Sequence, residues 1–274
     1  HIQQFFKRYW FKLNYRKLFS AHKIIRDLSL VQFIAYFGAW FSNVAIYTML
    51  VNFGSSEMAI SVVTAMHFLP AILIAPFSGA IIDRVKIKPL MITLLATELL
   101  MTILFLTIDN KDDLWLLMIL IFVRMSAASM FFSTEMSLLA KLLRGKPLQM
   151  ANEIHSIIWS FTYAAGMAVS GFVVNWYGVK TAFMIDAVIF AIALIVFIRI
   201  DFVVKASTAT DKILQLVKDG FTYIKNDKII LHLIFLHSSV GLTSFDALIT
   251  ILAKNEYKYI ISVPLAIGLS NAVR

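Results

Sequence analysis

The chain has 274 residues, of which 60% are hydrophobic and only 15% are charged, and its mean hydropathy is +0.81. A soluble domain usually holds about 45–50% apolar and about 25% charged residues, so this composition excludes a chain that covers itself with a polar surface in water. Cysteine is absent, which excludes disulfides, thiolate metal sites and cysteine nucleophiles. The net charge of +9 is compatible with nucleic acid or with a membrane, and the placement of the cations distinguishes the two.

Residues 1–29 form a basic segment with seven cations and one acid, Asp27. Aromatic side chains recur among the cations at helical spacing, beginning with Phe5 and Phe6. This pattern is typical of a helix that lies in the headgroup layer of a membrane. A solvated cytoplasmic tail explains the same charges, and the sequence leaves both interpretations open.

Seven apolar runs follow, each near the roughly 20 residues that a helix needs to cross a bilayer. The runs are residues 30–53, 57–82, 89–108, 114–139, 148–174, 179–200 and 229–252. An eighth run begins near Tyr259 and stops at Arg274, which is too short to span. Because most connections are short, neighbouring helices should pack antiparallel. We therefore predict an all-α integral membrane protein with a six-helix bundle over residues 30–200 and the start of a second bundle over residues 229–274.

The cations are distributed unequally between the two sides of these helices. Of 25 Lys and Arg residues, 19 fall on the side of the N-terminus and 4 on the opposite side, leaving Arg124 within a span and Arg274 at the end. Cations accumulate on the cytoplasmic side of membrane proteins, so the N-terminus should be cytoplasmic. The charge thus indicates a lipid bilayer as partner and argues against nucleic acid.

The longest connection, residues 201–228, lies on the same cytoplasmic side. Apolar residues such as Leu216 and Phe221 alternate there with Lys218 and Lys225 at helical spacing. This pattern predicts an amphipathic helix along the membrane surface.

The connection between the second and third runs reads GAIIDRVKIKP, from Gly79 to Pro89. This stretch resembles the loop between the second and third helices of major facilitator superfamily transporters. Four further stretches match in the same order: HFLPAILIAPFSG before the loop, FVRMSAASMFF in the fourth run, LQMAN before the fifth and GVKTAFMIDA at the sixth. The resemblance is strongest to the siderophore and drug exporters, the enterobactin-exporter-like branch.

The resemblance implies the N-terminal six-helix half of such a transporter together with the start of its second half. It implies a monomeric secondary active transporter, without cofactor, that moves a small amphipathic organic solute, including an anionic one, by alternating access driven by an ion gradient. The expected location is the bacterial cytoplasmic membrane. A lysophospholipid transporter and a non-transporting receptor or scaffold on the same fold are the alternatives.

An ionisable side chain in the bilayer centre costs roughly 2.5–3.5 kcal/mol, so each one requires an explanation. Arg124 in the fourth run should face water, an anion or a carboxylate, and Glu98 in the third lies at similar depth and is a candidate partner. The resemblance implies that Asp246, Asn43 and Trp40 line the central cavity, with Asp246 as a proton or substrate carboxylate. It makes Asp186 a packing and hydrogen-bonding residue.

A second set of polar residues lies near the cytoplasmic ends of the helices and is expected to act as a gate. Its members are Gly79, Asp83, Arg84, Lys88, Glu135 and Glu153. Gly79 should allow close helix approach, and Asp83 should accept hydrogen bonds from a helix N-terminus. Arg84 and Lys88 are predicted to bridge to Glu135 or Glu153.

Motifs of enzymes and metal sites are missing from the sequence. It contains no H-E-x-x-H, no G-x-S-x-G and no glycine-rich phosphate loop. The histidines His67, His232 and His237 show no metal-ligand spacing with a second ligand on one helical face. We therefore expect neither catalysis nor a metal site.

Overall fold

The computed structural model describes residues 15–202, 204, 213–241 and 246–273. All regular secondary structure in these residues is helical. The α-helices are α2 (Tyr15–Ala21), α3 (Lys23–Asn52), α4 (Glu57–Ile82), α5 (Ile87–Leu104), α6 (Leu114–Leu142), α7 (Lys146–Tyr177), α8 (Val179–Ile198), α9 (Ile213–Asn226), α10 (Lys228–Gly241), α11 (Asp246–Asn255) and α12 (Val263–Ala272). Three short 3-10 helices are η1 (Phe105–Thr107), η2 (Lys111–Asp113) and η3 (Tyr257–Tyr259).

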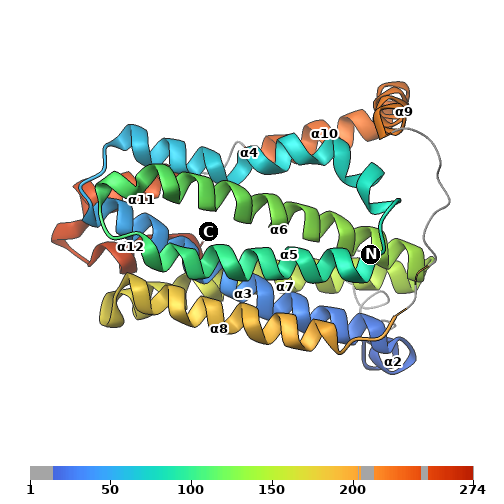
Figure 1. The fold of residues 1–274 in the computed structure, drawn as a ribbon, viewed down its shortest axis with the longest axis horizontal. Coiled ribbons are helices and arrows are strands. Elements are labelled where there is room, and N and C mark those ends of the chain that lie inside the picture. Colours follow the sequence, from blue (N-terminus) through green and yellow to red (C-terminus); the bar gives the residue numbers. More distant parts are fainter. Residues whose placement is uncertain (1–14, 203, 205–212, 242–245, 274) are drawn as a thin grey trace, which may run out of the picture.

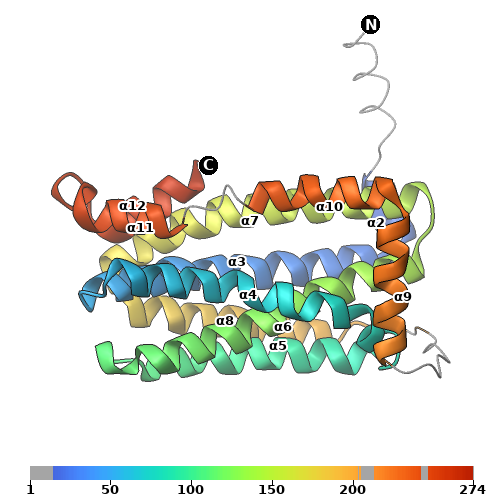
Figure 2. The same ribbon diagram turned by 90° about the horizontal axis from the view of Figure 1, so that it is seen from above.

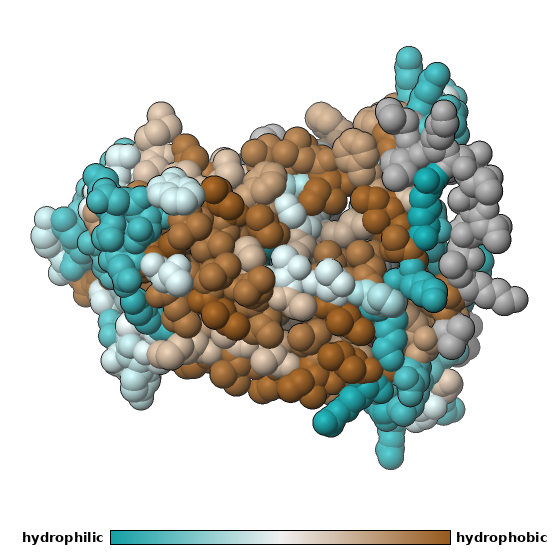
Figure 3. Space-filling model, viewed as in Figure 1, coloured by the Kyte–Doolittle hydropathy of each residue, from teal (hydrophilic) through white to brown (hydrophobic). Residues whose placement is uncertain are grey.

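Six helices of the described part, α3 to α8, are long and apolar enough to cross a membrane. They lie side by side along the long axis of the molecule (Figures 1 and 2). Their outer faces expose large apolar side chains, for example Ile72, Ile157 and Val188. On the face in Figure 3, hydrophobic residues form a belt with hydrophilic residues at both ends. An exposed belt of this size is stable in hydrocarbon rather than in water, and the predicted all-α membrane bundle is confirmed.

Local sequence sets the turns between these helices. Ser56 caps α4 by accepting a hydrogen bond from the backbone N–H of Ala59 at 3.2 Å. Gly178 separates α7 from α8 at a backbone φ of 84°, a left-handed conformation that favours glycine. Tight turns of this kind place consecutive helices antiparallel.

Helix α3 lies at the centre of the bundle and packs against α7 and α8. Its segment from Phe41 to Leu50 is buried on every side. Around it, α4 packs on α6, and α5 packs on α6 and α8. At the end of the bundle that holds the α3–α4 turn, α12 packs on α7 and α3, and α11 packs on α4.

One predicted boundary is wrong. Helix α3 begins at Lys23 rather than near Leu30, because Ile25 and Leu28 already pack in the core. In the seventh run, the structure describes α10 as far as Gly241 and α11 from Asp246, and residues 242–245 lie outside the described residues. A continuous seventh helix over residues 229–252 therefore stays a prediction.

The predicted linker helix is present as α9, which runs across the bundle direction in Figure 2 and contacts α4. Phe221 and Tyr223 are exposed on it. The predicted basic segment lies outside the described residues as far as residue 14, and the rest of it forms α2 and the first turns of α3.

Candidate functional site

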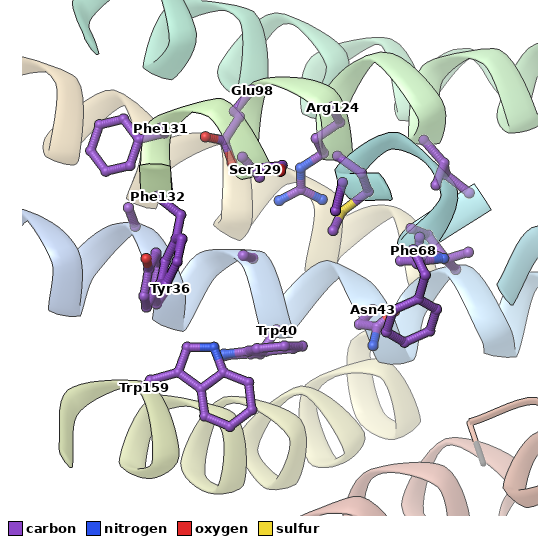
Figure 4. A pocket seen from close by; sticks show the side chains of 18 of the residues that line it. Tyr36, Trp40, Asn43, Phe68, Glu98, Arg124, Ser129, Phe131, Phe132 and Trp159 are labelled. Carbon is purple, nitrogen blue, oxygen red and sulfur yellow. The ribbon is translucent and has the colours of Figure 1, made fainter. Parts of the chain in front are cut away.

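A cavity of about 340 Å³ lies between α3, α4, α5, α6 and α7. Aromatic side chains form much of its wall (Figure 4): Tyr36, Trp40, Phe68, Phe131, Phe132 and Trp159. A volume of this size and a mostly apolar lining with a few polar groups are typical of small-molecule sites.

Four of the five predicted binding residues line this cavity: Trp40 and Asn43 from α3, Glu98 from α5 and Arg124 from α6. The fifth, Asp246, is buried at the first residue of α11 and is not among the lining residues. Helix α11 packs on α4. The predicted role of Asp246 as a proton or substrate carboxylate in the central cavity stays a prediction.

Arg124 is paired with Asp186 of α8, and the two side chains are almost completely buried. Arg124 Nη2 donates to Asp186 Oδ2 at 2.8 Å, and the hydroxyl of Ser42 donates to the same oxygen. The guanidinium also lies over two rings, 5.6 Å from the centroid of Phe105 and 5.1 Å from that of Phe190. Because a buried charge is tolerated only when it is paired and hydrogen-bonded, this arrangement explains how arginine is accommodated in the membrane.

The predicted Glu98–Arg124 pair is therefore wrong. Arg124 forms its ion pair with Asp186. The carboxylate of Glu98 has no hydrogen bond or ion pair among the described residues. Both Glu98 and Arg124 reach toward the same space in Figure 4. The hydrogen-bonding role predicted for Asp186 is confirmed. Its partner could not be identified from the sequence, because the two residues are 62 positions apart.

One wall of the cavity is an aromatic cluster that joins α3 to α7. Trp40 meets Trp159 edge to face at 5.6 Å between ring centroids and Tyr163 at 4.7 Å. Trp159 and Tyr163 stack at 5.7 Å. Gly166, one turn further along α7, makes room for this contact, because a Cβ there would stand 3.0 Å from the Cβ of Trp40. Sequence analysis missed Trp159, although its spacing of four from Tyr163 places both on one face of a helix.

The predicted gating residues lie at the opposite end of the bundle from the α3–α4 turn. Asp83 ends α4 and accepts a hydrogen bond from Lys141 Nζ of α6 at 2.9 Å. Lys88 lies 3.4 Å from Asp201, beyond the end of α8. Asp83 and Lys141 stand at adjacent ends of the packed helices α4 and α6. The resemblance assigns the helix N-terminus that Asp83 should accept from to the second half of the transporter, so that contact stays a prediction.

Three expectations for this group differ from the contacts in the described residues. Glu135 is buried, 3.8 Å from Nδ1 of His155, because it lies more than a turn inside α6 and out of reach of Arg84 and Lys88. Glu153 instead accepts hydrogen bonds from Tyr15 and Gln149. Nothing lies within 4 Å of the Cβ position at Gly79, so no close helix approach occurs there in the described residues.

Two smaller features complete this end of the molecule. Gln32 Nε2 lies 2.6 Å from His155 Nδ1 and donates to the His155 carbonyl oxygen at 3.2 Å, which fixes the imidazole between α3 and α7. On α2, burial raises the pKa of the Tyr15 hydroxyl above its ordinary value, and the neighbouring Glu153 carboxylate adds to this rise. Both features attach the start of α7 to the N-terminal helices.

Within the described ranges, no group of three or more His, Cys, Asp and Glu side chains is arranged to hold a metal ion.

Comparison with known proteins agrees with this architecture. Residues 28–273 match the family model of the Major Facilitator Superfamily. The chain is also 26% identical over 222 residues to the uncharacterized MFS-type transporter YfiS of Bacillus subtilis (strain 168). That match covers 79% of this chain and 52% of YfiS, so the chain spans about half the length of this relative. The family match extends over nearly the whole chain, and the protein belongs to the major facilitator superfamily.

Proposed function

We propose that this protein is a secondary active transporter that moves a small amphipathic organic solute across the bacterial cytoplasmic membrane by alternating access. The single observation that supports this most strongly is the cavity, because it lies among five membrane-spanning helices and combines an apolar wall with buried ionisable groups. Midplane sites between helices are where transporters of this architecture bind solute.

The orientation we propose places α2, α9 and the α4–α5 turn on the cytoplasmic side, following the excess of Lys and Arg there. The Asp83–Lys141 and Lys88–Asp201 pairs then lie at the cytoplasmic ends of the helices. We assign Asp83 to a latch that holds this end in one conformation.

We further propose that the transporter belongs with the exporters of siderophores and drugs and is driven by an ion gradient. The five motif matches support this branch. A lysophospholipid carrier is the alternative within the same class, since an aromatic cavity with charged groups also suits a single acyl chain and a headgroup.

The test is flux in proteoliposomes that contain the purified intact protein under an imposed proton or sodium gradient. We expect gradient-dependent movement of a solute from a panel of organic cations, siderophores and lysophospholipids. Trp40→Ala should abolish most of this flux because it removes the wall shared by α3 and α7. Trp115→Ala is the matched control, since Trp115 is 64% exposed at the start of α6 and outside the cavity.

Absence of flux for every solute in the panel, under both gradients, would contradict the proposal. Saturable binding without flux would instead indicate a receptor on the same fold.

A further inference from the structure

The cavity contains one carboxylate that the fold leaves unpartnered. Glu98 is 4% exposed and lines the cavity from α5. Within the described part of the chain its side chain makes no hydrogen bond and no ion pair, and only its backbone oxygen is used, by the hydroxyl of Thr102. Figure 4 shows the carboxylate beside the open space of the cavity.

The neighbouring positive charge is already compensated. Arg124 gives its hydrogen bond to Asp186, which also accepts from Ser42 and is completely buried. Arg124 and Asp186 together contribute no net charge, so an anion in the cavity would have to compete with a buried, hydrogen-bonded carboxylate. This argues against an anionic ligand on Arg124.

The remaining ionisable groups of the wall do not alter this balance. His67 makes a hydrogen bond of 2.9 Å with the carbonyl oxygen of Val63 on its own helix and stacks on Tyr47. Among the residues that line the cavity, Glu98 is therefore the carboxyl group without a hydrogen-bonding or ion-pair partner in the described part of the chain. A buried carboxylate without a partner is costly, and a positively charged ligand supplies the partner that the protein does not.

The rest of the wall suits such a ligand. Trp40, Trp159, Tyr36 and Phe132 present aromatic rings to the cavity. The faces of aromatic rings attract cations, most strongly those of Trp, and the same rings favour apolar substituents. Aromatic faces opposite a single carboxylate are a chemical match for an amphipathic organic cation.

We propose that the substrate of this cavity is an organic monocation with apolar substituents, whose charge lies against Glu98 and whose body lies against the aromatic wall of Trp40 and Trp159. That the cation is transported rests on the proposed function. That the cation binds in the cavity does not depend on transport and can be tested separately. It replaces the anionic solute that Arg124 suggested in the sequence.

The test uses two probes of the same shape and opposite charge, tetraphenylphosphonium and tetraphenylborate. Equilibrium binding is measured on the purified intact protein in detergent. We expect saturable binding of the cation and none of the anion. Glu98→Gln should weaken cation binding at least about tenfold, because a charge-assisted contact is lost while shape is kept. Glu98→Asp, which keeps the charge, should retain more affinity.

Glu256→Gln is the matched control, since Glu256 is exposed between α11 and η3 and should leave binding unchanged. Absence of saturable cation binding, tetraphenylborate binding of equal or greater strength, or an unaltered affinity in Glu98→Gln would overturn the inference. If the protein transports another solute but does not bind the cation, the transport function stands and this inference fails. If the protein binds the cation but shows no gradient-dependent flux of any solute, this inference stands and the proposed transport function fails.

Discussion

At the scale of single residues, the buried Arg124–Asp186 pair is expected to contribute to stability. Asp186→Asn removes the carboxylate that is hydrogen-bonded to the guanidinium of Arg124, and breaking a buried pair in this way costs about 3–5 kcal/mol. Ser42→Ala removes one hydrogen bond to Asp186 and should cost less, about 1–3 kcal/mol. Thermal unfolding in detergent should rank unmodified protein above Ser42→Ala and Ser42→Ala above Asp186→Asn.

The control for this series is Asp112→Asn, because Asp112 is exposed and its side chain makes no ion pair in the described residues. An Asp186→Asn protein as stable as this control would show that the pair does not stabilise the fold.

At the scale of helices, contact between α7 and α12 depends on two glycines. A Cβ at Gly268 would stand 2.6 Å from the Met167 carbonyl oxygen and 2.9 Å from the Cα of Gly171. Because both neighbours are backbone, Gly268→Ala should separate the helices and lower the unfolding temperature. Gly220→Ala on α9 is the matched control, since nothing lies within 4 Å of its Cβ position. There alanine should be neutral or stabilise by up to about 1 kcal/mol through helix propensity. Equal effects of the two substitutions would contradict this packing.

The ends of α4 and α6 allow a second test, of the proposed latch. Asp83→Lys alone should impair transport by placing two cations together, and Lys141→Asp alone should place two carboxylates together. The double variant Asp83→Lys with Lys141→Asp should restore part of the flux, because the pair is reformed with reversed sign. Flux that is normal in Asp83→Lys, or no better in the double variant, would remove the latch from the mechanism.

The sequence predicts the membrane-spanning helices better than it predicts the contacts between them. Length and hydropathy predict α3 to α8 because a span needs about 20 apolar residues and leaves little choice of structure. The partner of Arg124 was not predictable in this way, because Glu98 and Asp186 both lie at reachable depth and only the three-dimensional arrangement of the helices decides between them. Trp40 and Asn43 were placed correctly in the cavity because α3 is central to the bundle.

At the scale of the whole molecule, the proposed topology can be tested directly because the chain has no cysteine. Arg144, after α6, and Lys111, in η2, are exposed at opposite ends of the bundle. In sealed right-side-out vesicles a membrane-impermeant maleimide should label Lys111→Cys and should label Arg144→Cys only after permeabilisation, because the excess of cations marks the cytoplasmic side. The opposite pattern would invert the orientation.

Alternating access itself is tested at Asn43, which is buried beside the cavity in the centre of α3. We expect Asn43→Cys, as the sole cysteine, to react with the impermeant maleimide when the reagent is added to right-side-out vesicles and when it is added to inside-out vesicles. A transported solute should slow both reactions, since the cavity opens to each side in turn and is occupied by substrate. Reaction from one side alone, or rates that no transported solute changes, would contradict the account of this protein as an alternating-access transporter.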